Sequence, residues 1–522
     1  MKLLTSNLIN RFTNRAALAA ATAAILALGN GPAFARPLQT VRGLAPSDAN
    51  SGAQAREQAK SEQAVRQLKH IIVIYQENWS FDSLYGQFPG ANGYAYGFDA
   101  LPQRDKSTNY SSLIYMTPQP LNGGVTDTRF PPANGQPALP MIPYDFLQYV
   151  PVDGTTGDVI HRFYHEQLQI DNGVLEPSLG QQDKFVTWSD NPGLVLSYAD
   201  ATYLPEGQLA QLYTLCDNFF HSAYGGSFLN HQFLAAATAP LWEQTIPAGF
   251  QSSYDPTTLT LVDSNLTIDG KYAVNTTYGA QAPHPVGILA ADLLNVINDT
   301  DPSQSDYTPT IGDRLDGAHV SWRWYAGGWT DAVNGNPDPL FQFHHQPFAY
   351  YRKYAPYNPD GTINPQHFGP TARLQDETQF FADAANGTLP AVSFIKPLGP
   401  DNEHPGYASL LQGQQHVADL VAAVQQTKAW KDSAIIVTYD ENGGRWDHVP
   451  PTMLDSWGYG TRVPGLIISP FVRAGYIDHT QYETVSILKL IEKRFGLQPL
   501  SPRDANPAVS DLTPAFTITI GQ

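Results

Sequence analysis

Apolar residues are distributed along this chain in two repeating patterns. Short runs of consecutive apolar residues, rich in Ile and Val, predict strands that are buried on both faces. The predicted strands are His70–Tyr75, His319–Tyr325, Ala391–Ile395, Ser433–Tyr439 and Leu466–Ser469. Between these runs, apolar residues recur at helical spacing, as in Val417–Val424 and in Val485–Phe495, which Gly496 can end. The alternation predicts an α/β fold with a mostly parallel central sheet and helices on both faces.

Two loop-rich regions interrupt this alternation. Residues 95–158 are rich in Pro, Gly, Tyr and Asn, and residues 242–310 contain short alternating segments such as Leu259–Val262. We interpret both as insertions that cover the carboxyl edge of the sheet, where long functional loops are expected. No linker is evident between residues 36 and 522, so we expect this part of the chain to form a single domain.

The N-terminal segment has the pattern of a secretory signal peptide. Three basic residues precede the apolar stretch Ala16–Leu28, and Ala33–Ala35 supplies small residues at the offsets required for cleavage. The apolar stretch has 13 residues, which is too short to span a bilayer. We therefore expect residues 1–35 to be removed and the mature protein to be periplasmic or secreted.

The chain is acidic, with a formal net charge of −18. Removal of the first 35 residues leaves 27 basic and 48 acidic residues and a net charge of −21. Such a charge repels nucleic acid and anionic lipid, so we expect neither a nucleic-acid partner nor stable membrane insertion. A small anionic substrate is compatible with it, because a bound metal ion can invert the local field. The single cysteine, Cys216, excludes an intrachain disulfide, and the sequence leaves the oligomeric state open.

Two of the predicted strands end in oxygen-bearing side chains. Asp440 and Glu441 directly follow the fourth predicted strand, and Glu77 and Asn78 follow the first. Either end alone would fit a solvated acidic loop. Ligand sites in parallel sheets gather at the carboxyl ends of several strands, so the two ends together predict one site. Carboxylates crowded there require a cation, and oxygen ligands favour one hard divalent ion, whose identity stays open.

Ser227 is the candidate nucleophile. It follows Gly225 and Gly226 and precedes a predicted helix, where backbone N–H groups favour a phosphate. An ordinary N-cap serine fits this position equally well. The segment is not a serine-hydrolase elbow, because that motif requires glycine where Leu229 stands. Activation by a metal ion is therefore a better scheme than a Ser-His-Asp triad.

Four histidines in loops are candidates for contacts with a phosphate and for proton transfer. They are His161, His344, His345 and His404, the last of which follows the predicted strand Ala391–Ile395. One histidine alone is more often a surface or core residue, but several near a strand-end site suit phosphate binding and proton shuttling. Lys396 could add positive charge to the site, or could simply pair with nearby acids.

Four segments together resemble the bacterial phosphoesterase family that holds phosphatidylcholine-type phospholipases C and secreted acid phosphatases. They are ENWSFDSLYG at 77–86, GGSFLNHQ at 225–232, NEHPG at 402–406 and DENGGRWDHVPP at 440–451. The resemblance runs from about residue 70 to residue 495. It implies an alkaline-phosphatase-like α/β fold with a single metal ion. Trp79 departs from the pattern, since many members carry Arg or His there.

The resemblance also implies roles for individual residues. The implied metal ligands are Glu77, Asn78, Ser227, Asp440 and Glu441. Ser227 would be the nucleophile, and His345 or His404 would protonate the leaving oxygen. The implied contacts to the phosphate are made by Asn78, His161, His344, His345 and His404.

The segment around Ser227 resembles the acid phosphatase branch, because the phospholipase branch carries threonine in a G-P-T-N-P-N-like stretch. The predicted function is therefore a secreted, metal-dependent acid phosphatase that hydrolyses small phosphomonoesters through a phosphoserine. A phospholipase C acting on phosphatidylcholine-type lipids is the alternative. A binding protein without turnover is a third possibility, which the intact nucleophile and ligand set disfavour.

Overall fold

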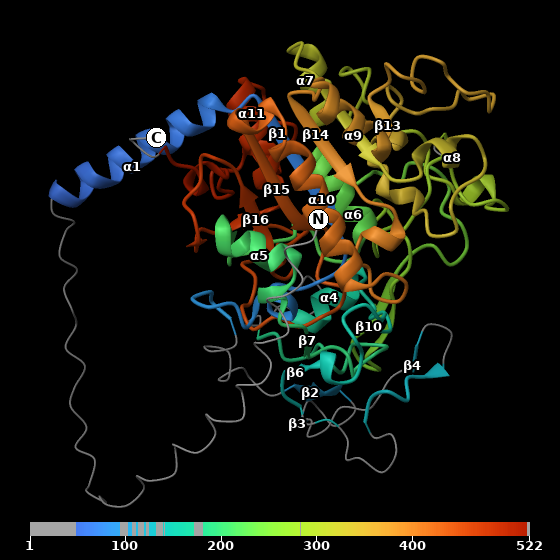
Figure 1. The fold of residues 1–522 in the computed structure, drawn as a ribbon. Coiled ribbons are helices and arrows are strands. Elements are labelled where there is room, and N and C mark those ends of the chain that lie inside the picture. The colour runs from blue at the N-terminus through green and yellow to red at the C-terminus, as the bar shows by residue number, and fades with distance from the viewer. Residues whose placement is uncertain are drawn as a thin grey trace, which may run out of the picture. The chain divides into compact units, whose positions relative to one another are not determined.

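An eight-stranded sheet forms the centre of the fold (Figure 1). The computed structural model describes residues 48–93, 103–106, 111–112, 120–121, 125–131, 139, 141–171, 181–281 and 283–518. The strands, in spatial order, are β13 (Leu374–Asp376), β12 (Trp322–Ala326), β14 (Val392–Lys396), β1 (His70–Gln76), β15 (Ser433–Tyr439), β16 (Gly465–Ile468), β8 (Thr214–Cys216) and β17 (Tyr476–Asp478). Only β16 among them runs antiparallel to its neighbours. The predicted mostly parallel sheet is confirmed.

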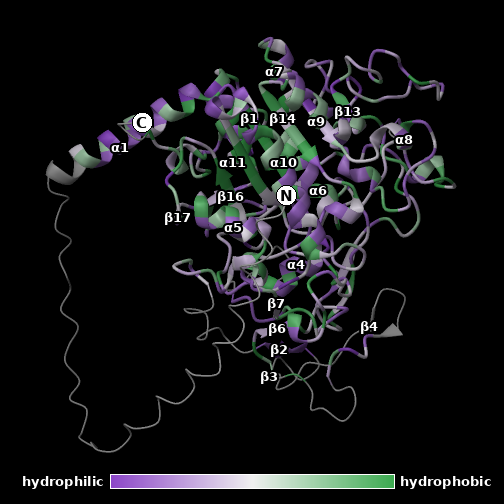
Figure 2. Ribbon diagram, in the orientation of Figure 1, coloured by the Kyte–Doolittle hydropathy of each residue, from purple (hydrophilic) through white to green (hydrophobic). Residues whose placement is uncertain are grey.

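The two central strands explain where the site forms. β1 lies between β14 and β15 and is parallel to both. Gln76 at the end of β1 is in register with Tyr439 at the end of β15. Since Glu77 and Asp440 are the next residues, their carboxylates emerge side by side at one edge of the sheet. Figure 2 shows hydrophobic residues concentrated in these strands, as expected for a sheet covered on both faces.

Helices pack against the sheet in two groups. α10 (Leu410–Gln425) contacts α5 (Pro205–Leu212) and α9 (Glu377–Asn386), while α11 (Thr484–Phe495) contacts α6 (Ser227–Ala236), which also contacts α7 (Ile311–Gly317). Both predicted helices are present. The C-cap of α11 is Gly496, whose φ of 68° is a left-handed conformation that glycine adopts without strain. In the described part of the chain, no helix is both long and apolar enough to cross a membrane.

The predicted strand at 319–325 begins later than expected. His319 has a φ of 56°, and the backbone N–H of Val320 donates to the carbonyl of Leu315, so these residues close the end of α7. The strand therefore starts at Trp322. The strands β8, β13 and β17 were not predicted, because three residues carry too little periodicity to identify a strand.

Part of the second loop-rich region, residues 242–310, is hydrogen-bonded to the segment that follows His161, a predicted site residue. Asp263 Oδ2 accepts hydrogen bonds from the backbone N–H groups of Tyr164 and His165, at 2.8 Å each. Asn275 Oδ1 accepts a bond from the backbone N–H of Phe163 at 3.1 Å. These bonds hold the first turn of α4 (Phe163–Ile170), directly after His161. They support the proposal that residues 242–310 are an insertion that covers the site.

Candidate active site

A cavity of about 400 Å³ opens at the carboxyl edge of the sheet. Its walls are mostly polar. The residues that line it include Glu77, Asp158, His161, Arg162, Asp190, Ser227, Asn275, Thr276, Gln342, His344, His345, His404 and Tyr407. Three further predicted site residues, Asn78, Asp440 and Glu441, are fully buried beside these side chains. The structure thus brings together all of the residues that the sequence singled out.

Ser227 is the first residue of α6, and its hydroxyl is not used to cap that helix. The N-cap is Gly226, so the interpretation of Ser227 as an N-cap serine is wrong. Its Oγ lies 3.5 Å from Glu77 Oε2, to which it donates. Gly225 has a φ of 89°, and a Cβ there would lie 2.6 Å from the backbone nitrogen of Phe163. The glycine turn therefore lets α4 approach closely while it presents the serine.

The loops after β1 and β15 cross at van der Waals distance. Asn78 has a left-handed backbone with a φ of 64°. Gly443 has a φ of 62°, and a Cβ there would lie 2.3 Å from the carbonyl oxygen of Asn78. No other residue type fits that contact without strain. Gly443 is therefore required for the loop after β15 to pass this close to Asn78.

The carboxylates carry strongly perturbed pKa values. Burial and the neighbouring charge of Glu77 raise the pKa of Asp440 well above its usual value, and burial also raises that of Glu441. Burial opposes ionisation of Glu77 as well, yet His345 and Lys396 hold the pKa of this carboxyl well below its usual value. Three buried carboxyl groups therefore crowd one point, where Asp440 and Glu441 favour the protonated form unless a cation stabilises their charge.

The donor set fits a divalent metal ion. Asn78 Oδ1, Asp440 Oδ1 and Glu441 Oε1 are buried and find no hydrogen-bond partner among the described residues. Together with Glu77 Oε2 and Ser227 Oγ, they are the oxygen ligands that a hard cation prefers. When bound, such an ion would neutralise the carboxylates, lower the pKa of the serine hydroxyl and polarise a P–O bond.

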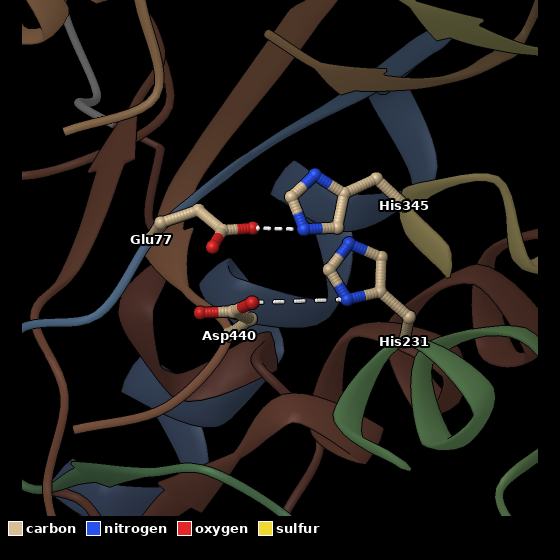
Figure 3. Close-up of side chains that lie close together, drawn as sticks. All are labelled: Glu77, His231, His345 and Asp440. Carbon is tan, nitrogen blue, oxygen red and sulfur yellow. Dashed lines mark ion pairs between the residues drawn. The ribbon is translucent and has the colours of Figure 1, made fainter. Parts of the chain in front are cut away.

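His345 and His231 lie next to Glu77 and Asp440, and we call their side of the carboxylate cluster the inner side. His345 Nε2 lies 2.7 Å from Glu77 Oε1, and burial lowers the pKa of His345 to about 4. His231 Nδ1 donates to the carbonyl of Ser227 at 2.7 Å and lies 3.8 Å from Asp440 Oδ2. The ring centroids of the two histidines are 5.0 Å apart and the rings are stacked. Figure 3 shows the two rings next to each other, facing Glu77 and Asp440. Glu77, Asp440, His231 and His345 form a second set of atoms that could hold a metal ion.

The sequence did not lead us to His231 as a site residue, and it did not show where Lys396 lies. His231 lies four residues after Ser227 on α6, a spacing that places two side chains on one helix face, and this signal could have identified it. Lys396 is the last residue of β14, and its side chain is fully buried against Glu77. Lys396 pairs with an acid, and because that acid is Glu77, the lysine also brings positive charge to the site.

His161 and His404 lie on the other side of the carboxylate cluster, which we call the outer side. His161 Nδ1 donates to the carbonyl of Val159 at 2.6 Å, which leaves Nε2 3.4 Å from Asn78 Nδ2 and 3.6 Å from Glu441 Oε1. His404 Nε2 lies 3.9 Å from Glu77 Oε2. Both rings line the cavity.

Three further side chains, Tyr407, His344 and Trp79, differ in how they relate to the cavity. Tyr407 stacks on His404, with the ring centroids 4.4 Å apart. His344 has an unpartnered Nδ1 among the described residues and a pKa lowered by burial. Trp79 donates to the carbonyl of Glu403 at 3.0 Å and does not line the cavity. The unusual residue at position 79 therefore supports a loop and makes no contact with the cavity.

The comparison with known proteins settles the family. The sequence profile of the Phosphoesterase family matches residues 68–498. This chain belongs to the Phosphoesterase family. The predicted resemblance is confirmed, and with it the class of reaction, the hydrolysis of phosphoric esters.

Similar sequences include several enzymes described as phospholipases C. Phospholipase C B of Mycobacterium tuberculosis is 25% identical over 486 residues, which cover 86% of this chain and 77% of that protein. A non-hemolytic phospholipase C of Pseudomonas aeruginosa is 22% identical, over 87% of this chain and 57% of that protein. Non-specific phospholipase C6 of Arabidopsis thaliana is 29% identical over 25% of this chain and 31% of that protein.

Solved structures give only a weak likeness. A protein in the alkaline phosphatase superfamily from Vibrio parahaemolyticus is 11% identical, with a TM-score of 0.30 over 60% of this chain and 64% of that one. A phosphonate monoester hydrolase from Silicibacter pomeroyi is 11% identical, with a TM-score of 0.30 over 62% and 74% of the two chains. The fold is of the kind expected from the sequence, and these likenesses carry no argument about substrate.

A pair of buried carboxyl groups supports the loop that carries His404. Tyr439 Oη donates to Glu403 Oε2 at 2.9 Å and lies 3.2 Å from Glu206 Oε2. Glu403 also has a left-handed backbone, with a φ of 71°. Burial raises the pKa of Glu206 to about 7 and that of Glu403 well above its usual value. The phosphoesterase therefore keeps a proton on this pair that its unfolded chain would release.

This pair predicts how the stability of the phosphoesterase depends on pH. Because the folded state binds more protons than the unfolded state, the free energy of unfolding should fall as pH rises from the usual pKa of glutamate toward 7. Glu206→Gln should remove part of this loss and raise stability by roughly 2 kcal/mol at about pH 8, with little change at about pH 5. Urea unfolding at both pH values measures this. The exposed Glu243→Gln is the control, and an equal effect of Glu206→Gln at both pH values would contradict the shared proton.

Proposed function

We propose that this phosphoesterase is a metal-dependent phosphatase in which Ser227 forms a phosphoserine. The observation that carries the proposal is the position of the Ser227 hydroxyl. It stands in the first turn of α6, is free of any capping bond, and points at Glu77 Oε2 in the wall of a polar cavity. In the first step Ser227 Oγ bonds to phosphorus and the bond from phosphorus to the leaving oxygen breaks. In the second, water attacks phosphorus and Ser227 Oγ departs.

The side chains divide the remaining tasks between them. Glu77 Oε2 accepts a hydrogen bond from the Ser227 hydroxyl and can take its proton. Asn78 Nδ2 and the Nε2 atom of His161 lie together at the outer side, where they can contact the non-bridging oxygens that gain charge in the transition state. Residues Glu77, Asn78, Asp440 and Glu441 would hold the metal ion.

His404 suits the role of general acid better than His345. The Nε2 atom of His345 is engaged by Glu77 Oε1 at 2.7 Å, so it is not directed at a leaving group. His404 Nδ1 faces the carbonyl of Pro405, which leaves Nε2 on the cavity side, 3.9 Å from Glu77 Oε2. His404 would give its proton to the leaving oxygen and recover one from the attacking water. Because histidine donates only in its protonated form, we expect higher activity at acidic than at alkaline pH.

Substitution of His404 tests this role through the leaving group. His404→Ala should reduce kcat for an alkyl phosphate, a poor leaving group, by about 10²–10⁴-fold. For a nitrophenyl phosphate, whose leaving oxygen needs no proton, the loss should be much smaller. The measurement is kcat for both substrates with both proteins. An equal loss on both would remove His404 from proton transfer.

Small monoesters are the proposed substrates. The cavity is lined mainly by histidine, acidic and amide side chains, which suits a phosphate group better than an acyl chain. The segment around Ser227 resembles the phosphatase branch, which also supports monoesters.

Export of the mature chain stays a prediction from the sequence, because residues 1–35 lie outside the described residues.

A phospholipase C activity is the second candidate, and two observations favour it. The relatives described as phospholipases C cover most of this chain. In addition, the residues that line a second hollow of about 540 Å³ include five prolines, Phe341, Phe343 and Tyr357. Phe341 and Phe343 line this hollow, while Gln342 and His344 line the catalytic cavity, so one segment separates the two spaces.

One comparison separates the two candidates. It measures kcat/KM for an aryl phosphate and for phosphatidylcholine at the same pH and with the same metal ion. We expect the aryl phosphate to be strongly preferred. A preference for the phospholipid would replace the phosphatase proposal with the phospholipase one.

A further inference from the structure

Lys396 is buried among the charged residues at the sheet edge. It ends β14, next to β1, and its Nζ contacts Glu77 Oε1 and lies 3.8 Å from Asp440 Oδ2. The Lys396, Glu77 and Asp440 side chains are fully buried, and the ammonium also lies 5.3 Å from the centre of the Tyr75 ring. A lysine is rarely buried to this extent unless it is paired.

The two oxygens of Glu77 face different partners. Oε2 faces the outer side, where Ser227 Oγ lies at 3.5 Å and His404 Nε2 at 3.9 Å. Oε1 faces the inner side, where it contacts Lys396 and His345. Asp440 takes part in the same division, because its Oδ2 atom is the one within ion-pair distance of Lys396 Nζ. One oxygen of each carboxylate therefore lies near the positive charge on the inner side, and the other oxygen is available to a ligand.

We propose that Lys396 is a fixed internal cation that takes the inner side of the Glu77–Asp440 pair and limits the site to one divalent ion. Hydrolases that use two metal ions hold them about 3.5–4 Å apart and stabilise both the attacking and the leaving oxygen. Here a lysine ammonium takes the inner position. It offsets the repulsion between two buried carboxylates and keeps them in place for the ion on the outer side. Lys396 is a positioning residue, and the proposal rests on the metal site of the proposed function.

An ordinary structural ion pair would behave differently. If Lys396 only stabilised the fold, its removal would lower the melting temperature and leave the number of bound ions unchanged. If it takes the inner position, its removal opens a buried space lined by Glu77 Oε1, Asp440 Oδ2 and the ring nitrogens of His231 and His345. That donor set can accept a second divalent ion.

The test counts ions and does not depend on turnover. Wild-type protein, Lys396→Ala and Lys184→Ala are stripped with chelator, dialysed to equilibrium against Mn²⁺ and analysed for metal per chain. Lys184 is a matched control, because it is also buried and paired with an acid, Asp171. We expect one ion in wild type and in Lys184→Ala, and two in Lys396→Ala. We also expect Mn²⁺ to raise the melting temperature of Lys396→Ala more than that of wild type.

Each other outcome is decisive. Two ions in the wild type, or one ion in Lys396→Ala, would overturn the role of Lys396 and leave the proposed metal site intact. No ion in the wild type would overturn the metal site itself, and the proposal with it. If Lys396→Ala does not fold without metal, it is refolded with Mn²⁺ present. Recovery with two ions supports the proposal, and failure to fold under that condition overturns it.

Discussion

Ser227→Ala is expected to lose at least ~10³-fold in kcat on an aryl phosphate while it keeps its fold, because the covalent route through the hydroxyl is removed. The loss of stability should be about 1 kcal/mol or less. The hydrogen bond from the hydroxyl to Glu77 Oε2 is long, at 3.5 Å, and the cap of α6 is supplied by Gly226. Steady-state kinetics and thermal unfolding of the purified variant measure the two effects.

Ser222→Ala provides a matched control on the same segment. Ser222 is buried, and its hydroxyl accepts a hydrogen bond from the backbone N–H of Val485 at 3.0 Å, away from the cavity. This variant should lose stability and keep its kcat. A folded Ser227→Ala protein with activity within about tenfold of wild type would refute the assignment of the nucleophile.

Asp440→Asn is expected to weaken divalent-ion binding by at least ~10²-fold and to reduce activity in parallel, more than the loss usual for residues outside the ligand shell. The substitution keeps the shape of the side chain and removes one of the crowded buried charges that a cation would neutralise. Titration calorimetry of chelator-treated protein measures the affinity. Dialysis of wild type against chelator should abolish activity, and a divalent ion should restore it.

The control for this substitution is Asp190→Asn. Asp190 lines the same cavity but lies outside the buried cluster, and its Oδ1 accepts a hydrogen bond from the backbone N–H of Ile160, a bond that asparagine can keep. Its ion affinity should be unchanged. If Asp440→Asn bound the ion as tightly as wild type, Asp440 would not be a ligand.

The sequence located the sheet edge well because the strands that build it have strong signals. The predicted strand Ser433–Tyr439 has the observed bounds, and β1 extends the prediction by only one residue, Gln76. Since parallel strands align their carboxyl ends, the proximity of Glu77 and Asp440 followed from the strand ends alone. The helix after Ser227 was also predictable from the glycine turn and the apolar residues beyond it.

Other parts of the site depend on contacts that a sequence does not encode locally. His344 and His345 lie in a short 3₁₀ segment whose position is set by packing against α6, so their distance from Glu77 could not be predicted. Lys396 had two interpretations because the neighbour of β14 in the sheet was unknown. Once β14 pairs with β1, the lysine lies beside Glu77, and the ion pair compensates its burial.

The stereochemical course at phosphorus tests the central claim most directly. A substrate whose phosphate is made chiral with oxygen isotopes is cleaved, and the phosphate is captured by an alcohol acceptor. Two in-line displacements, first by Ser227 and then by the acceptor, predict net retention of configuration. Net inversion would mean that a single displacement occurs without a phosphoserine, and would contradict the account.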